Sequence, residues 1–411
     1  MSRCLSGFTA TLFLLGLFLA GCATPLPPTY ENTLSGPALD GPVLALAGEG
    51  ELVAAVTGKG LFLKKGDGPW VNQEVPGLGT FSGVTCLAVV KGAVYLGSDG
   101  DGLHILSNGV WEVKTSRYGG LPDDGVLSIA ADDHKDDQQS RAVWVGTRKG
   151  FASYRDGEWK VYKPDADWLI DMTGRSGRGT GQVYLGGSYR LGRQGEDSDL
   201  FKPPVTAIGI GAGRLVLGNA DSRIAIISGD GMAIVSLREA EAVTRLVVEE
   251  GTIWAGTERG LLWGGLRDVA MGKPWPTHHP YLGWTGTLFG SRDSRPFEYR
   301  WKRMGYNNAL VTSLQGSGED IWAADRSDEP VRLGQPKRGY DETDKEGVNP
   351  VSAVRRFVNV HEYIARRETS RYETYGPSAG VRGDPAAVYV APGADRVWIG
   401  TSKGLWELEQ Y

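Results

Sequence analysis

Few residues in this sequence combine the types and spacing that catalysis or metal binding requires. His278 and His279 are its only adjacent histidines, and no third ligand stands at a spacing typical of zinc sites. The sequence also lacks a glycine-rich phosphate loop after a strand and a nucleophile elbow. One acidic loop lacks the alternating ligands and the glycine of a calcium loop; its aspartates are Asp132, Asp133, Asp136 and Asp137. We therefore predict no catalytic residue, no metal ion and no cofactor.

The N-terminal residues indicate a covalent modification instead. Arg3 precedes an apolar stretch from Phe8 to Ala20, and Leu19-Ala-Gly-Cys22 resembles the bacterial lipoprotein box. We predict that residues 1–21 are a signal peptide and that the Cys22 thiol carries a diacylglyceryl group. The apolar stretch is shorter than the ~20 residues of a membrane-spanning helix, whereas several acyl chains hold a protein firmly. An ordinary secretory signal with a chance cysteine is the alternative.

The other cysteines and the residue after Cys22 bear on location. Cys4 leaves with the signal peptide, so Cys86 stands alone and no intramolecular disulfide forms. Cys86 lies in the apolar run Val84–Val90 and is predicted to be a small buried filler. Ala23 stands where an aspartate would favour retention in the inner membrane of enteric-type bacteria. We therefore predict a lipid-anchored envelope protein, with the outer membrane favoured and either its periplasmic or its surface face.

The elements that would position any site repeat along the chain. Residues 142–162 hold three short β-prone segments joined by two glycine-containing turns, and residues 125–130 supply a fourth. Four antiparallel strands joined by hairpins make one blade of a β-propeller. Similar segments begin at Val53, Val94, Val143, Val183, Leu215, Ile253, Ile321 and Val397. Their period of roughly 40 to 50 residues is typical of propellers. We predict an all-β propeller with eight four-stranded blades, or seven if the ring absorbs one degenerate repeat.

The repeat resembles that of the two-component regulator propeller family, which runs Val-Trp-x-Gly-Thr, Gly-Leu, a turn and a Trp strand. The likeness is best at residues 142–162, 251–263 and 396–408. It implies an extracytoplasmic sensor domain with a glycan or small-molecule ligand. No transmembrane helix, kinase or DNA-binding segment follows the repeats up to Tyr411, so the resemblance implies the fold and not a signalling activity.

Aromatic residues fall into two groups. The tryptophans of the repeats share one strand position and are predicted to pack between blades: Trp144, Trp254, Trp322 and Trp398. Trp275, Tyr281 and Trp284 fall outside the repeats, beside His278 and His279. Aromatic rings stack on sugars or anchor protein partners. These five residues are therefore candidates for binding a ligand or a partner.

Closure and two insertions complete the predicted propeller domain, residues 37–411. The last repeat lacks an outer strand, and Thr29–Ser35 is predicted to supply it, which makes residues 22–36 a tether and closing strand. The gaps that follow Ile253 and Ile321 exceed one blade and mark insertions at about 266–296 and 336–370. Long loops on a rigid scaffold often carry function.

The second insertion has a helical period. Asn349 and Pro350 suit the start of a helix. Five apolar residues and one histidine follow at spacings of three, four and seven: Val351, Val354, Phe357, Val358, His361 and Ile364. We predict an amphipathic helix whose arginines are candidates for partner binding: Arg355, Arg356, Arg366 and Arg367.

Charge and composition limit the function. A net charge of −5 with both signs interspersed argues against nucleic acid as a partner. We predict a lipid-anchored extracytoplasmic propeller that acts by binding a ligand or an envelope protein, in sensing. The first alternative is a structural scaffold of an envelope protein complex. The second is a propeller-type lyase or hydrolase, which would need an acid and a base converging on the central channel.

Overall fold

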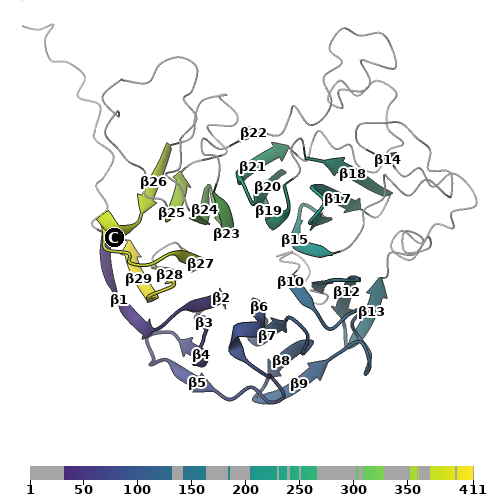
Figure 1. The fold of residues 1–411 in the computed structure, drawn as a ribbon, viewed down its shortest axis with the longest axis horizontal. Coiled ribbons are helices and arrows are strands. Elements are labelled where there is room, and N and C mark those ends of the chain that lie inside the picture. Colours follow the sequence, from purple (N-terminus) through teal and green to yellow (C-terminus); the bar gives the residue numbers. More distant parts are fainter. Residues whose placement is uncertain are drawn as a thin grey trace, which may run out of the picture.

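The computed structural model shows a closed ring of seven antiparallel sheets, the blades of a β-propeller (Figure 1). It describes residues 32–131, 142–162, 184–185, 204–228, 231–237, 241–249, 251–265, 302–303, 309–327, 352–358, 360, 371–393 and 396–410. Each blade runs from an inner strand beside the central axis to an outer strand at the rim. Within the described ranges, no helix is both long and apolar enough to span a bilayer.

Blades 1 to 3 follow one another along the chain. Blade 1 contains β2 (Val43–Glu49), β3 (Leu52–Thr57), β4 (Gly60–Lys65) and β5 (Val71–Gln73). Blade 2 contains β6 (Val84–Val90), β7 (Ala93–Ser98), β8 (Leu103–Ser107) and β9 (Val110–Lys114), with the short 3-10 helix η1 (Phe81–Gly83) before it. Blade 3 contains β10 (Val126–Ala131), β11 (Val143–Thr147), β12 (Gly150–Arg155) and β13 (Glu158–Tyr162).

Blades 4 to 7 complete the ring. Blade 4 contains β15 (Val205–Gly211), β16 (Arg214–Asn219), β17 (Arg223–Ser228), β18 (Gly231–Ser236) and, at its rim, β14 (Tyr184–Leu185). Blade 5 contains β19 (Val243–Glu249), β20 (Thr252–Thr257), β21 (Gly260–Gly265) and β22 (Lys302–Arg303). Blade 6 contains β23 (Leu310–Ser317), β24 (Asp320–Arg326), β25 (Ala353–Val358) and β26 (Arg371–Tyr375). Blade 7 contains β27 (Pro385–Val390), β28 (Arg396–Thr401), β29 (Gly404–Gln410) and β1 (Asn32–Asp40), and η5 (Pro377–Ala379) precedes it.

The eight-blade prediction is wrong, because the repeat that begins at Val183 does not form a blade. Its described residues, Tyr184 and Leu185, are β14, which pairs in parallel with β18 at the outer edge of blade 4. The two neighbouring blades meet directly instead. A Cβ atom at Gly146 of blade 3 would lie 2.6 Å from the carbonyl oxygen of Val205 in blade 4. That contact leaves no space for another blade.

The repeat glycine allows neighbouring blades to approach this closely, because it has no Cβ atom. Added Cβ atoms at Gly97, Gly218 and Gly256 would come within 2.6 Å of the first inner-strand valine of the next blade. Those valines are Val126, Val243 and Val311. The same contact joins blade 7 to blade 1, through Gly400 and Val43. The glycine of the Trp-x-Gly-Thr pattern is therefore explained by the packing between blades as well as by the fold of a single blade.

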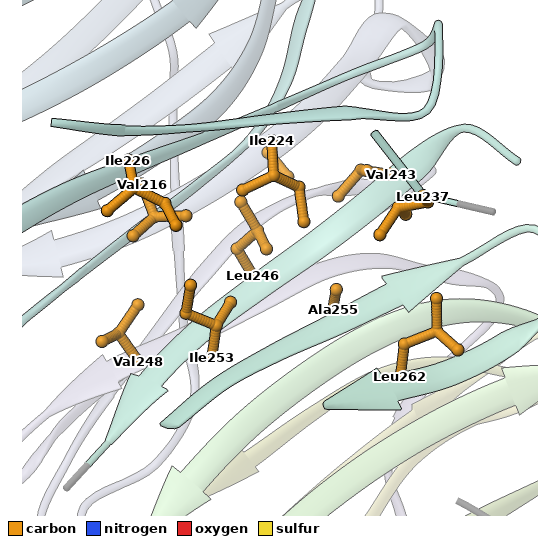
Figure 2. Packing of buried hydrophobic residues seen from close by; sticks show 11 residues of the cluster. Val216, Ile224, Ile226, Leu237, Val243, Leu246, Val248, Ile253, Ala255 and Leu262 are labelled. Carbon is orange, nitrogen blue, oxygen red and sulfur yellow. The ribbon is translucent and has the colours of Figure 1, made fainter. Parts of the chain in front are cut away.

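Apolar clusters fill the spaces between blades. Figure 2 shows one of them, where Val216, Ile224 and Ile226 of blade 4 face Leu246 and Val248 of blade 5. The repeat tryptophans lie in such clusters as predicted: Trp254, Trp322 and Trp398 are almost fully buried, and Trp144 is partly buried. Burial of large flat side chains between blades makes the ring a rigid body.

The N-terminal strand closes the ring. β1 is the outer strand of blade 7 and pairs antiparallel with β29, with Asn32 opposite Gln410 and Ser35 opposite Glu407. The predicted closure is confirmed for Asn32–Ser35, and the strand continues to Asp40. The pairing covers the hydrogen-bonding edge that β29 would otherwise leave open.

The predicted helix of the second insertion is wrong over residues 353–358. These residues are β25, which pairs with β24 on one side and β26 on the other. A strand between two others inside a blade has both faces covered, so Val354 and Phe357 are both buried although they point to opposite faces. The apolar spacing therefore fitted a helix by chance. The first insertion, 266–296, lies outside the described residues, as does most of the second.

Candidate functional site

The inner strands share one irregularity that shapes the centre of the ring. Each has a register shift near its start, where one residue has no partner on the second strand of its blade. We call this the bulge residue; the seven are Leu44, Thr85, Leu127, Thr206, Thr244, Thr312 and Ala386. We call the next residue the post-bulge residue; these are Ala45, Cys86, Ser128, Ala207, Arg245, Ser313 and Ala387.

Bulge threonines connect neighbouring blades. The hydroxyl of Thr85 donates to the carbonyl oxygen of Val126 at 2.5 Å, and that of Thr206 to Val243 at 2.5 Å. Thr244 and Thr312 make the same bond to the next blade, at 2.7 and 3.2 Å. In blade 3 the bulge residue is leucine, and the post-bulge Ser128 donates to Val205 at 3.2 Å instead. These bonds fix the positions of the inner strands around the axis.

All seven inner strands line a central channel with a volume of about 410 Å³. Pockets that bind small molecules are commonly of this size. Six of the post-bulge residues are small or short, and the seventh is Arg245. The residues that follow them are aliphatic in every blade: Leu46, Leu87, Ile129, Ile208, Leu246, Leu314 and Val388. The channel also has hydroxyl and amide groups in its lining, and Arg245 is the one cationic side chain among its described lining residues.

The guanidinium of Arg245 makes one hydrogen bond to the described part of the chain. Its Nη1 donates to the carbonyl oxygen of Thr244 at 2.6 Å. The side chain is surrounded by protein yet partly exposed to the channel. Burial lowers the pKa of Arg245 from its usual value, but a guanidinium keeps its charge at neutral pH. The structure therefore keeps a cation where solvation is poor.

Two other titratable groups line the channel. Burial raises the pKa of the Cys86 thiol to about 11, which agrees with the predicted role of Cys86 as an unreactive filler. Burial also raises the pKa of Tyr389 to about 12, and the nearby Glu49 acts in the same direction. The ring of Tyr389 occupies the space that a Cβ atom at Gly48 would need. Both groups are neutral at pH 7, so neither is a base or a counter-ion there.

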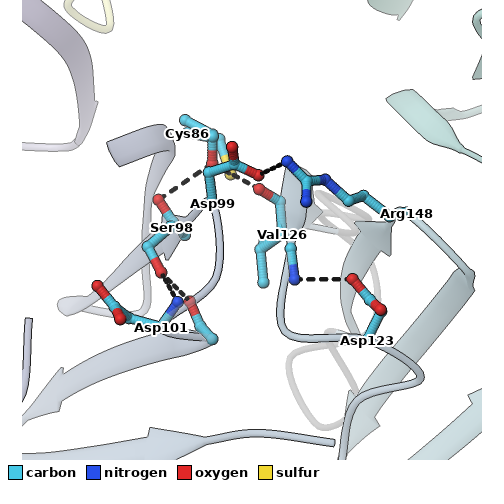
Figure 3. A network of polar contacts seen from close by, with 11 residues as sticks. Cys86, Ser98, Asp99, Asp101, Asp123, Val126 and Arg148 are labelled. Carbon is cyan, nitrogen blue, oxygen red and sulfur yellow. Dashed lines mark hydrogen bonds and ion pairs between the residues drawn. The ribbon is translucent and has the colours of Figure 1, made fainter. Parts of the chain in front are cut away.

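Charged residues in turns of blades 2 and 3 form ion pairs and hydrogen bonds within the ring. Figure 3 shows Arg148 of blade 3 paired with Asp99 of blade 2. Asp123 accepts from the backbone N–H of Gly125 at 2.9 Å and pairs with Lys149 at 2.9 Å. Every one of these charges has a partner of opposite sign, and the described residues contain no cluster of three metal-ligating side chains.

The predicted binding residues are only partly described. Trp275, His278, His279, Tyr281 and Trp284 lie outside the described residues. So do Arg366, Arg367 and the lipid site Cys22. The aspartates of the acidic loop, Asp132, Asp133, Asp136 and Asp137, lie outside as well. Binding and lipidation at these positions stay predictions.

Arg355 and Arg356 have partners inside blade 6. Arg355 is fully buried and forms an ion pair with Asp325, which is also fully buried. Arg356 donates from Nε to Asp320 at 2.7 Å and lies over the ring of Trp322. The structure places both arginines in β25, where they stabilise the blade. A binding role for them stays a prediction, and the Arg355 side chain is not accessible to a partner.

The sequence did not point to Arg245. One signal was present: Val243-Thr-Arg245 matches Val84-Thr-Cys86 and Val311-Thr-Ser313, and only the last residue differs in size and charge. Once the inner strands are aligned on their threonines, a long cation stands where the other repeats have short neutral residues.

Comparison with solved structures places the fold among known propellers. No protein-family model matches the chain, and no curated protein gives a significant sequence match. The extracellular domain of the putative one-component system BT4673 from B. thetaiotaomicron is 15% identical over 93% of this chain, with a TM-score of 0.50. This chain spans 40% of that domain's length.

Two other propellers match over nearly their whole length. The WD40 β-propeller domain of Doa1 is 14% identical, with a TM-score of 0.51, and the match covers 93% of this chain and 97% of that one. A structure of YCF48 bound to D1 peptide is 10% identical, with a TM-score of 0.50, and the match covers 94% and 96%. At these identities the likeness shows the fold.

Proposed function

We propose that the chain is a lipid-anchored β-propeller of the bacterial envelope that binds a ligand or a protein partner in sensing. The position of β1 carries this proposal. The strand is built into the rim of blade 7 and begins at Asn32, ten residues (32 − 22) after the predicted lipid site Cys22. A rigid binding ring would therefore be joined to the membrane by a short segment.

Chain length limits how far the ring can stand from the lipid. An extended chain spans at most about 3.6 Å per residue, so ten residues reach about 36 Å. This is comparable to the width of a small domain, so blade 7 would stay beside the bilayer. An anchored propeller of this kind is placed to meet envelope components, and the fold it shares with an extracellular domain supports the same placement.

The described channel favours binding over catalysis. An acid and a base converging on the channel would support the lyase or hydrolase alternative, but its described lining contains no carboxylate and no imidazole. The scaffold alternative relied on an exposed helix in the second insertion, and residues 353–358 of that segment form a strand inside blade 6. Neither alternative gains support from the described residues.

Lipidation is tested by Cys22→Ser. The variant should move from the membrane fraction to the soluble fraction and lose labelling by a fatty-acid analogue. Cys86→Ser is the matched control, because it removes a thiol inside the propeller and should keep both the label and the membrane fractionation. A wild-type protein that never takes the label would contradict the proposal.

Partner binding is tested by shortening the insertions. Residues 266–296 and 336–350 would each be replaced by a Gly/Ser linker; the second replacement stops at 350 so that β25 stays intact. The shortened proteins should keep the wild-type melting temperature and lose the partner that the full chain crosslinks to in intact envelopes. Equal crosslinking by both shortened proteins would move the binding surface to the ring itself.

A further inference from the structure

Arg245 is the most unusual residue of the described ring. Its six counterparts at the post-bulge position are alanine, serine or cysteine, and these suffice for closely packed inner strands. A buried cation lowers stability unless a partner compensates for lost hydration. Packing therefore gives no reason for a guanidinium at this place.

The described structure supplies no anion for this cation. Its one hydrogen bond within the described chain goes to the carbonyl oxygen of Thr244 and uses one of its five N–H groups. The thiol of Cys86 is the titratable group close enough to affect it, and that thiol is neutral at pH 7. The acidic residue nearest this end on its own strand, Glu249, stands at the far end of β19 and has contacts there.

The surroundings of Arg245 indicate the kind of anion that would fit. The short post-bulge residues leave room at the level of the guanidinium. Guanidinium N–H groups form a planar fork that matches the two oxygens of a carboxylate.

We propose that the central channel is a binding site for a small carboxylate, with Arg245 as the residue that pairs with it. The carboxylate accepts two hydrogen bonds from the guanidinium. The site belongs to the ring and not to the insertions. It therefore stands independently of the envelope anchoring and of any protein partner.

The test uses trifluoroacetate as the probe, with the full mature chain. Fluorine NMR would follow the probe's line width at constant ionic strength set with sodium chloride. The wild-type protein should broaden the line, and acetate should reverse the broadening at lower concentration than inorganic phosphate does. Arg245→Gln should abolish the broadening. Arg117→Gln removes an equal charge from an exposed loop and should leave it unchanged.

A second substitution keeps the test decisive if Arg245→Gln fails to fold. Arg245→Lys retains the charge but loses the fork, so it should bind the probe about tenfold more weakly, the effect of one charge-assisted hydrogen bond. No broadening by wild type, or equal broadening by folded Arg245→Gln, would overturn the proposal. Displacement by phosphate at lower concentration than by acetate would overturn the assignment to carboxylates.

Discussion

Blades 2 and 6 each bury a polar residue at the same position of their third strand, opposite the residue that precedes the repeat glycine position. The two blades compensate for its burial in different ways. His104 in β8 lies opposite Leu96, and Arg355 in β25 lies opposite Ala323. Both polar side chains are fully buried. In the other blades the equivalent residue is apolar: Phe62, Ala152, Ala225, Leu262 and Trp406.

The two blades differ in the residue directly after the repeat glycine position. Blade 6 has Asp325 there, two residues after Ala323, and this carboxylate pairs with Arg355. Blade 2 has Ser98, which carries no charge. Burial lowers the pKa of His104, more strongly than the nearby Asp101 raises it, so the imidazole is neutral. One blade keeps a buried charge by pairing it, and the other removes the charge. The interior of a blade thus accommodates either an ion pair or a neutral imidazole, and we expect the two to respond differently to mutation.

The largest effect is expected from breaking the pair in blade 6. Arg355→Leu leaves Asp325 buried and charged without its partner, which should cost about 3–5 kcal/mol of unfolding free energy in a denaturant titration. Asp325→Thr combined with Arg355→Leu gives blade 6 the residues of blade 5 and should recover most of that loss. If the double variant were as unstable as the single variant, the unpaired charge of Asp325 would not be the cause of the lost stability.

The next largest effect is expected at the repeat glycine position, where blades 2 and 6 have different residues. Blade 2 has Gly97 where blade 6 has Ala324. A Cβ atom at Gly97 would lie 2.5 Å from the Cys86 sulfur and 2.6 Å from Val126. Gly97→Ala should therefore lower the unfolding free energy by about 1–3 kcal/mol through overpacking. Ala324→Gly is the reverse control and should cost no more than about 1 kcal/mol.

The stability of the protein should also respond to pH through blade 2, where His104 is buried. The pKa of His104 is lowered in the folded protein from 6.5, so the unfolded chain binds the proton first as the pH falls below about 6.5. Stability should then decrease between that value and the folded pKa, by at most about 1.4 kcal/mol per pH unit. His104→Leu should remove this part of the pH dependence. An unchanged profile in the variant would show that His104 is not the responsible group.

The smallest effect concerns Ser98, the blade 2 counterpart of Asp325. Its hydroxyl oxygen accepts from the backbone N–H of Asp101 at 2.9 Å and donates to the carbonyl oxygen of Gly102 at 3.1 Å. Ser98→Ala should cost about 1 kcal/mol because the turn loses these bonds. Ser107→Ala, at an exposed position on β8, should leave the melting temperature unchanged. Equal melting temperatures for the two variants would mean that the turn does not depend on this hydroxyl.

Much of the fold was predictable because its signals are local. The repeat glycine and the buried tryptophan serve blade packing, and one or both recur in the second strands of every blade except blade 1. The closing role of Asn32–Ser35 followed from the missing outer strand of the last repeat. The repeat at Val183 was wrongly predicted to form a blade, because a strand-like pentapeptide does not reveal whether three further strands will pair with it. Residues 353–358 misled because a strand covered on both faces needs no alternation of apolar and polar residues.

The candidate site was less predictable for a physical reason. Arg245 draws attention only when the seven inner strands are superimposed on their bulges, and each bulge is defined by pairing with the second strand of its blade. In sequence, Val243-Thr-Arg-Leu-Val-Val is an ordinary β-prone segment. The aromatic and histidine residues of 266–296 were easier to notice because they interrupt a period, but the described structure does not test them.

The pairing of β1 with β29 also sets an order of events when the protein is made. Residues at opposite ends of the chain, Asn32 and Gln410, are neighbours in one sheet. During synthesis the blades can form in turn as they emerge, but β1 cannot pair until β29 has been made. Contacts this distant in sequence slow the final step of folding. Until then β1 has no partner strand, so an interrupted chain leaves an open edge that proteases and chaperones can recognise.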